Sequence, residues 1–201
     1  MIHILTLCTG NVCRSPLSAQ LFTDRLDPKF FRAESAGLSP LTGDRMPTEM
    51  HRIVARFGLE DATAHRARAL TIETLTNSDL IIGMSRHHRS AAVLLHLPAV
   101  RQAFTLLELA HIVSHIEEQD VRAVVQRHTD VEFAVLETVV RMRGMVPRLS
   151  PARRYDVEDP YGRSHQAFER SAQQIYDAVD QIAAFFHRVF ATHQRKLQER
   201  S

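Results

Sequence analysis

The chain has 201 residues, of which 44% are hydrophobic and 24% charged, and its formal charge is +2. These values are typical of one folded domain, and so small a net charge gives no reason to expect binding to nucleic acid or to a membrane. Both cysteines, Cys8 and Cys13, lie in one short segment, which excludes a disulfide-stabilised secreted scaffold. With no secretion signal or membrane-spanning run in the sequence, we expect a soluble, cytoplasmic protein.

Four short apolar runs predict β-strands, at residues 2–7, 30–35, 80–84 and 100–105. Between them lie segments whose apolar residues recur at helical spacing. This alternation predicts an α/β fold, a four-stranded parallel sheet flanked by helices. Ligands of such folds bind at the carboxyl ends of the strands, which is where Cys8 falls.

The second half of the chain is predicted to be mainly helical. Residues 109–148 carry an apolar stripe, so we expect a helical insertion of one or two helices. We favour packing of this insert on its own domain over a homodimer or partner surface. A last long helix is expected from about Ser164 into the 190s, followed by a frayed, charged tail at residues 193–201. Residues 1–201 would then form a single domain.

The segment with the clearest chemistry follows the first predicted strand. Its residues are Cys8, Thr9, Gly10, Asn11, Val12, Cys13, Arg14, Ser15 and Pro16. Gly10 and Asn11 tolerate the backbone conformations that a tight loop needs, and Ser15 can cap a helix that begins after it. The pattern predicts a loop between strand and helix whose backbone N–H groups surround a tetrahedral oxyanion.

Cys8 and Arg14 are the chemically active residues of this loop. The helix N-terminus and the Arg14 guanidinium both favour the thiolate form of Cys8, which is the nucleophilic form. The planar guanidinium of Arg14 can bind two phosphoryl oxygens at once, which a lysine cannot do. The loop therefore predicts a nucleophilic cysteine beneath a bound phosphoryl group.

The Cys-x5-Arg-Ser-Pro pattern resembles the phosphate-binding loop of the low-molecular-weight protein tyrosine phosphatases. The resemblance covers roughly residues 1–108 and 156–190 and does not cover the insert. It implies phosphomonoester hydrolysis, with protein phosphotyrosine as the expected substrate, through a cysteinyl-phosphate on Cys8. It implies no metal and no other cofactor, and the expected partner is a phosphorylated protein or a small phosphomonoester.

A leaving oxygen needs a proton donor, because an alkoxide or phenoxide leaves poorly otherwise. Asp159, Pro160 and Tyr161 resemble the family's Asp-Pro-Tyr acid loop. The resemblance implies that Asp159 is the general acid and then the base that activates water, with Asp156 as the second candidate. Tyr161 would stand at the rim of the pocket and stack on a substrate phenol.

Further roles follow from the resemblance. Ser35 and His65 would hydrogen-bond Asn11, and Ser15 would hydrogen-bond the thiolate of Cys8. Leu41 stands in the loop after the second strand where animal enzymes carry a large aromatic residue. The preference for phosphotyrosine over smaller phosphomonoesters is therefore left open.

Two further features allow more than one interpretation. Cys13 would either trap an oxidised Cys8 as a disulfide, as the resemblance suggests, or pack as a small buried side chain beneath the loop. The run Arg-His-His-Arg at residues 86–89 is interpreted as a solvated helix start.

Two other functions compete with phosphatase activity. An arsenate reductase would use the same thiolate, and since no cysteine lies outside the loop, it would need an external small thiol. A non-catalytic phosphate-binding module would keep the loop without the catalytic set. The presence of Cys8, Arg14 and Asp159 favours an enzyme over the binding module.

Overall fold

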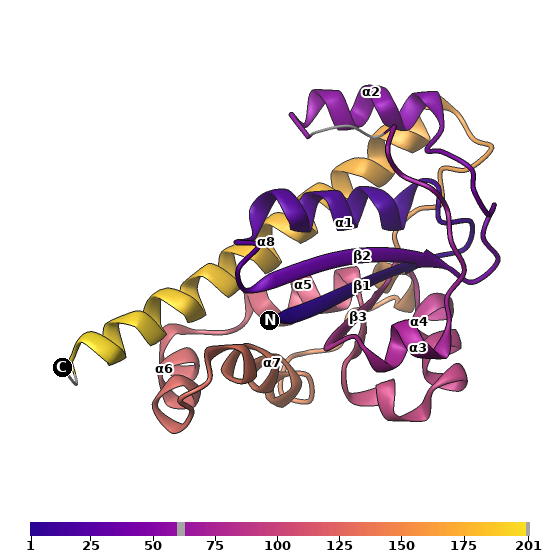
Figure 1. The fold of residues 1–201 in the computed structure, drawn as a ribbon. Helices are drawn as coiled ribbons and strands as arrows, with labels where there is room; N and C mark the ends of the chain where they lie inside the picture. The colour runs from indigo at the N-terminus through magenta and orange to yellow at the C-terminus, as the bar shows by residue number, and fades with distance from the viewer. Residues whose placement is uncertain (60–62, 200–201) are drawn as a thin grey trace.

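A four-stranded parallel sheet forms the centre of the protein in the computed structural model, which describes residues 1–59 and 63–199 (Figure 1). The strands are β1 (Ile2–Cys8), β2 (Phe31–Gly37), β3 (Leu80–Gly83) and β4 (Ala103–Thr105). They lie in the order β2-β1-β3-β4, and each neighbouring pair is parallel. The predicted α/β fold is confirmed. Because Cys8 is the last residue of a central strand, it lies at the carboxyl edge of the sheet.

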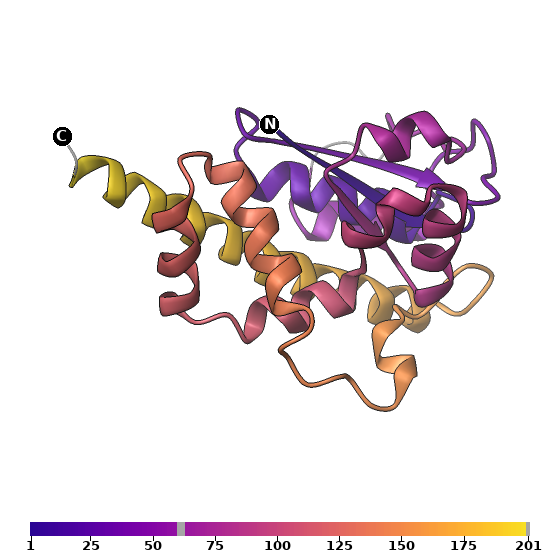
Figure 2. The same cartoon turned by 90° about the horizontal axis from the view of Figure 1, so that it is seen from below.

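Helices cover both faces of this sheet (Figures 1 and 2). They are α1 (Arg14–Arg25), α2 (Thr48–Arg56), α3 (Ile72–Thr76), α4 (Arg86–Leu95), α5 (Leu106–Ser114), α6 (Glu118–Arg127), α7 (Val131–Met142) and α8 (His165–Gln198), with 3-10 turns η1 (Leu97–Arg101) and η2 (Ala152–Tyr155). Side chains of β1 alternate between two cores, as strand geometry requires. Ile2 and Ile4 join the larger core with α1, α5 and α8, whereas Leu5 and Leu7 join a smaller core with α3 and α4.

The fourth strand is shorter than predicted. Residues 97–101 form η1, and only Ala103–Thr105 pairs with β3. Pro98 stands in the first turn of η1, where its missing N–H costs nothing, and this turn continues through Val100 and Arg101, the first two residues of the predicted strand. Apolar composition alone does not distinguish these two conformations.

The insert consists of α6, α7 and the end of α5, and it packs against α8 (Figure 2). Most of its predicted apolar stripe is buried in the larger core: Val121, Val124, Val125, Val135, Val139 and Met142. These side chains are therefore covered by the chain itself. Phe133 and Val140, on the other side of α7, remain exposed.

The predicted frayed tail is wrong for the residues that the structure describes, because α8 continues to Gln198. Lys196 Nζ donates hydrogen bonds to the carbonyl oxygens of Val125 and His128, each at 2.6 Å, at the end of α6. His193 is buried and bonds the carbonyl of Thr129. Polar tail residues are thus ordered by partners far away in sequence. Although α8 is long, no helix within residues 1–59 and 63–199 has the length and apolarity needed to cross a membrane.

Candidate active site

The sulfur of Cys8 lies beneath the loop that joins β1 to α1, residues 8–15, which we call the phosphate-binding loop. The backbone N–H of Asn11 donates to Cys8 Sγ at 3.2 Å and the hydroxyl of Ser15 donates at 2.9 Å. Two donors aimed at one sulfur stabilise negative charge on it. Ser15 does not cap the helix, because α1 already begins at Arg14 and the hydroxyl is engaged with the sulfur.

Asn11 occupies the centre of the loop and has a positive φ of 55°. Its side-chain amide donates to the hydroxyls of Ser15 at 3.0 Å and Ser35 at 2.9 Å, and its side-chain oxygen accepts from the N–H of Arg68 at 2.9 Å. The carbonyl of Asn11 accepts from His65 Nε2 at 2.7 Å. The structure therefore places both predicted supporting residues on Asn11. These bonds offset the cost of a left-handed non-glycine residue.

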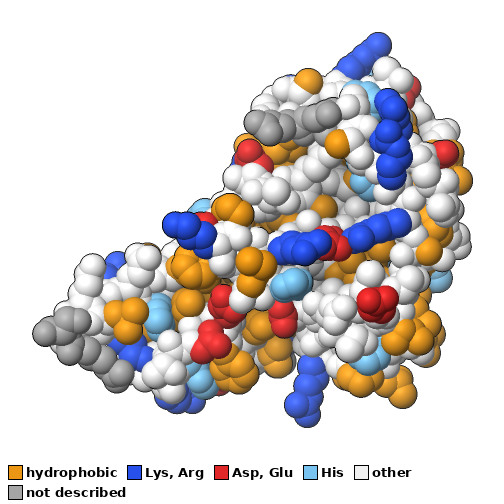
Figure 3. Space-filling view, viewed as in Figure 1, with side chains coloured by type: hydrophobic (Ala, Val, Ile, Leu, Met, Phe, Trp, Pro, Cys, Tyr) orange, Lys and Arg blue, Asp and Glu red, His pale blue; other side chains and the backbone are white. Residues whose placement is uncertain are grey.

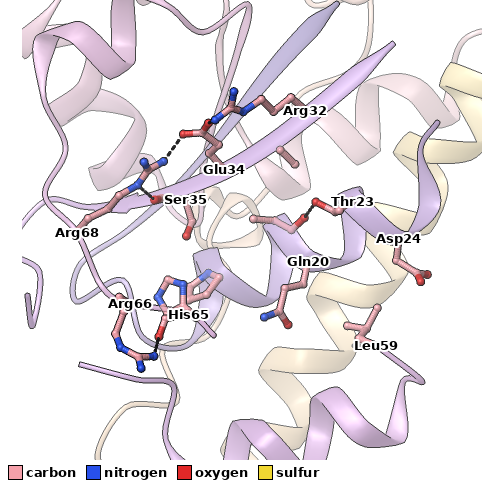
Figure 4. A pocket seen from close by; sticks show the side chains of 13 residues that line it. Gln20, Thr23, Asp24, Arg32, Glu34, Ser35, Leu59, His65, Arg66 and Arg68 are labelled. Atoms are coloured by element: carbon pink, nitrogen blue, oxygen red, sulfur yellow. Dashed lines mark hydrogen bonds and ion pairs between the residues drawn. The ribbon is translucent and has the colours of Figure 1, made fainter. Parts of the chain in front are cut away.

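A large cavity, of about 720 Å³, lies between α1, β2 and residues 65–68, and Figure 4 shows its lining. Ser35 and His65 approach Asn11 from this side, whereas Cys8 does not line the cavity. Three of its charged side chains pair with one another, since Glu34 forms ion pairs with Arg32 and Arg68. Figure 3 shows the same alternation of basic and acidic groups over β2. Two residues of the cavity lining, Ser35 and His65, therefore support the phosphate-binding loop through their hydrogen bonds to Asn11.

The loop after β2 runs beside the phosphate-binding loop and was only partly anticipated. The N–H groups of Ser39 and Leu41 donate to the carbonyls of Thr9 and Gly10, both at 3.1 Å. At Gly37 a Cβ would lie 2.6 Å from the Thr9 carbonyl oxygen, so only glycine allows this approach. Sequence reasoning missed Ser39, although a hydroxyl two residues past a strand that ends beside Cys8 was a usable signal.

Residues from both ends of the chain meet in a cavity of about 180 Å³ above the sulfur. It is lined by Cys8, Thr9, Gly10, Val12, Cys13, Arg14, Ser39, Leu41, Asp159 and Tyr161. Arg14 Nη2 lies 2.5 Å from a carboxylate oxygen of Asp159, and the two side chains are 6% and 46% exposed. A buried cation at the floor and a half-exposed carboxyl at the opening suit an anionic ligand that must also exchange a proton.

Asp159 belongs to a segment, residues 156–162, that we call the acid loop. It is attached to the rest of the fold before Asp159 itself. The N–H of Val157 donates to the carbonyl of Met84 at 2.9 Å, and Arg170 binds both carboxylate oxygens of Glu158, at 3.0 and 2.9 Å. Asp159 therefore reaches Arg14 from a backbone that is held on its N-terminal side.

Asp156, the second candidate acid, does not line the cavity above Cys8. Its carboxylate accepts hydrogen bonds from both the backbone and the guanidinium of Arg86, two of them at 2.7 Å. Burial raises the pKa of Asp156, but the hydrogen bonds and charge of Arg86 outweigh it and hold that pKa below its usual value. Asp156 therefore stays ionised and paired, which leaves Asp159 as the carboxyl group in the cavity.

Residues 3–124 match the family described as "Low molecular weight phosphotyrosine protein phosphatase", and they include the whole phosphate-binding loop. The chain belongs to this family. The resemblance and the enzyme class inferred from sequence are thereby confirmed, and phosphomonoester hydrolysis through a cysteinyl-phosphate is the chemistry characteristic of the family. The matched residues end before the acid loop, so the role of Asp159 stays a prediction.

Similarity to known proteins extends beyond the residues that match the family. "Probable low molecular weight protein-tyrosine-phosphatase EpsP" from Ralstonia nicotianae is 25% identical over 177 residues, which are 88% of this chain and 90% of EpsP. Etp from Escherichia coli is 36% identical over 85 residues, 42% of this chain and 55% of Etp. Among solved structures, YwlE arginine phosphatase from Geobacillus stearothermophilus has a TM-score of 0.65 at 20% identity and covers 92% of each chain. The phosphatase therefore shares its fold with proteins named for different phosphorylated residues.

The second thiol of the phosphatase, Cys13, lines the same cavity as Cys8 but differs from it chemically. Burial, and then the neighbouring Cys8, raise the pKa of Cys13 to about 12, so it is a neutral thiol at pH 7. No sulfur-accepting bond of the kind seen at Cys8 is found for Cys13 among the described residues. Both cysteines are free in the structure, and the redox role of Cys13 remains a prediction.

The predicted solvated helix start at residues 86–89 is wrong for His88. His88 is only 2% exposed and bonds the hydroxyls of Ser85 at 2.7 Å and Thr9 at 3.0 Å. Burial, followed by the positive charge of Arg14, lowers the pKa of His88 to about 3. The ring is therefore neutral throughout the physiological range.

We expect His88 to make the folded phosphatase less stable as the pH falls. Between pH 6.5 and about 3 the unfolded chain binds a proton at His88 that the folded chain does not bind, so the free energy of unfolding decreases on acidification. One such site contributes at most about 1.4 kcal/mol per pH unit. The free energy of unfolding can be measured with urea at about pH 7 and about pH 5. It should decrease less between these pH values for His88→Asn than for the wild type. Equal losses in the two proteins would contradict the assignment.

Proposed function

We propose that this phosphatase hydrolyses phosphotyrosine in proteins, with Cys8 as nucleophile, Arg14 binding the phosphoryl oxygens and Asp159 as the acid. The observation that carries the proposal is the Asp159 carboxylate, 2.5 Å from the Arg14 guanidinium in the cavity that holds Cys8. A carboxyl group at this place can reach the leaving oxygen of a phosphoryl group bound between Arg14 and the loop amides.

The reaction has two steps. In the first, the Cys8 thiolate attacks phosphorus, the bond between phosphorus and the ester oxygen breaks, and Asp159 gives its proton to that oxygen. In the second, water attacks the phosphocysteine, Asp159 takes a proton from the water, and the phosphorus–sulfur bond breaks. Ser15 donates to the departing sulfur from 2.9 Å, while Arg14 and the loop amides stabilise the phosphoryl oxygens in both steps.

The walls of the cavity favour an aryl ester. Val12, Leu41 and Tyr161 line it, and Leu41 and Tyr161 are 38% and 57% exposed at its opening. An aromatic ring can stack on Tyr161 and contact Leu41, whereas a charged guanidinium, although it also stacks on tyrosine, would lose hydration against Leu41. Phosphotyrosine therefore fits these walls better than phosphoarginine does.

A substrate panel tests the proposal directly. We expect a burst of phenol release from an aryl phosphate, and a kcat/KM for a phosphotyrosine peptide at least about tenfold above that for phosphoserine or phosphoarginine peptides. A higher kcat/KM for phosphoarginine would instead identify an arginine phosphatase, and arsenate-dependent consumption of a small thiol without a burst would identify an arsenate reductase. Either result overturns the proposal.

The rim supplies a further prediction. Leu41→Phe should lower KM for an aryl phosphate by about fivefold, because an aromatic pair adds roughly 0.5–1.5 kcal/mol beyond area burial. Leu41→Ala is the matched control and should raise KM, while the turnover of a small alkyl phosphate should respond to neither change. Steady-state kinetics on the three proteins measures this, and an unchanged KM for Leu41→Phe would place the substrate ring elsewhere.

The cellular compartment and the assembly state belong to the proposal. Because the nucleophile is a free thiol, a reducing compartment protects it, and we place the phosphatase in the cytoplasm. A phosphorylated protein is its partner. A homodimer through the insert would use its exposed apolar side chains, which include Phe133 and Val140 on α7 and Met145 after it.

A further inference from the structure

The turn that joins β3 to α4 lies beside both catalytic segments. Ser85 caps α4, and its hydroxyl accepts the N–H of His88. At Gly83 a Cβ would lie 2.7 Å from the N atom of Arg89 and 3.0 Å from the Ser85 carbonyl oxygen. Glycine therefore allows the first turn of α4 to fold closely over the end of β3, which pairs with the end of β1.

One contact from this turn reaches the phosphate-binding loop. The ring of His88 bonds Ser85 through Nδ1 and Thr9 through Nε2, at 2.7 and 3.0 Å. Thr9 follows Cys8 directly, and its carbonyl accepts the N–H of Ser39. Since His88 is buried and neutral, it can bond both hydroxyls without bringing a second cation to Arg14.

A second contact from the same turn reaches the acid loop. Arg86 binds Asp156 through its backbone N–H and its guanidinium, and the Met84 carbonyl accepts the N–H of Val157. These bonds lie two and three residues before Asp159, which is the group that enters the cavity. The position of the carboxyl group thus depends on where α4 begins.

We propose that the first turn of α4 sets the two catalytic segments relative to each other, with His88 positioning the phosphate-binding loop and Arg86 positioning the acid loop. The proposal deepens the proposed function and rests on it, since it concerns the same Cys8 and Asp159. Both are positioning residues, because each acts through another residue, Thr9 or Asp156, and neither lines the cavity above Cys8.

The two contacts predict different defects. His88→Phe keeps a flat ring but loses both hydrogen bonds, so orthovanadate affinity and kcat/KM for aryl phosphates should each fall by about tenfold. His88→Asn, which retains a donor and an acceptor, should recover part of this loss. Thr9→Val should resemble His88→Phe, because both changes remove the hydrogen bond between Thr9 and His88. For the same reason the double variant should be no worse than the poorer single variant.

Arg86→Ala should instead leave orthovanadate affinity unchanged. Its kcat/KM should fall by about tenfold for phenyl phosphate, a poor leaving group, and by less than about twofold for 4-nitrophenyl phosphate, whose leaving oxygen hardly needs a proton. The contrast between the two substrates distinguishes a misplaced acid from a general loss of structure.

Each variant has a matched control in the chain. Arg56→Ala is the control for Arg86→Ala, because it removes an ion pair with Glu169 that is equally exposed. The side chains of Arg56 and Glu169 are 49% and 29% exposed, and those of Arg86 and Asp156 are 50% and 27% exposed. His193→Phe removes another buried histidine that makes a long-range hydrogen bond. Neither control should change orthovanadate affinity or the dependence on leaving group, whatever it does to the melting temperature.

The outcomes separate this proposal from the proposed function. If His88→Phe and Arg86→Ala lower only the melting temperature and keep wild-type affinity and leaving-group dependence, the turn is merely structural and the proposal is wrong. If wild type shows no burst, the proposed function fails instead. Orthovanadate binding to wild type and His88→Phe then still reports whether His88 positions the loop.

Discussion

Cys8→Ser should bind inorganic phosphate and orthovanadate but should not turn over an aryl phosphate. The serine hydroxyl keeps the shape of the site and the loop amides, but it lacks the nucleophilicity of a thiolate. We expect kcat to fall by about 10⁴-fold or more, as when other enzymes lose their nucleophile. Stopped-flow measurement of phenol release should show no burst, while titration with orthovanadate should show a folded, occupied site.

Cys13→Ser is the matched control, because Cys13 lines the same cavity and is a buried, neutral thiol. It should retain the burst. A normal turnover rate in Cys8→Ser, or loss of the burst only in Cys13→Ser, would move the nucleophile and contradict the proposed mechanism.

Asp159→Ala should reduce kcat/KM by about 10²- to 10³-fold for phenyl phosphate, since positioned proton donors contribute on this scale. The reduction should be much smaller for 4-nitrophenyl phosphate, and the slope of log(kcat/KM) against the pKa of the leaving group should become steeper. Removal of the carboxylate also frees Arg14 from its ion pair, so orthovanadate affinity should be kept or increased.

The leaving-group series contains its own control for Asp159→Ala, because good leaving groups report phosphoryl transfer without assistance. The loss should exceed that of Arg86→Ala, which displaces the acid without removing it. An equal loss on every substrate would mean that Asp159 shapes the site rather than donating a proton.

The local chemistry of this phosphatase was predictable because it is encoded in consecutive residues. Cys8, Asn11 and Arg14 act within one loop, and their spacing determines which groups can surround an anion. Strand and helix alternation likewise predicted the parallel sheet, since each element shows its own apolar period. Asp159 was found through a three-residue motif, although its distance from Cys8 could not be inferred from the chain.

Two of the wrong predictions share one physical cause. His88 and Lys196 are polar, and polarity in sequence suggested solvent exposure, yet each finds its hydrogen-bond partners on an element distant in sequence. A polar group can be buried wherever such partners exist, and no local pattern announces them. The same holds for Asp156, whose partner Arg86 lies 70 residues earlier.

The sequence by itself predicted Cys8 as the nucleophile, and it determined the phosphate-binding loop and the order of strands and helices along the chain, because short-range spacing and periodicity are sufficient to specify them. Only the tertiary structure decided which carboxyl group enters the cavity, that α4 contacts both catalytic segments, and that the insert and the end of α8 cover each other. These features depend on hydrogen bonds and burial between residues far apart in the chain, and such contacts exist only once the chain has folded.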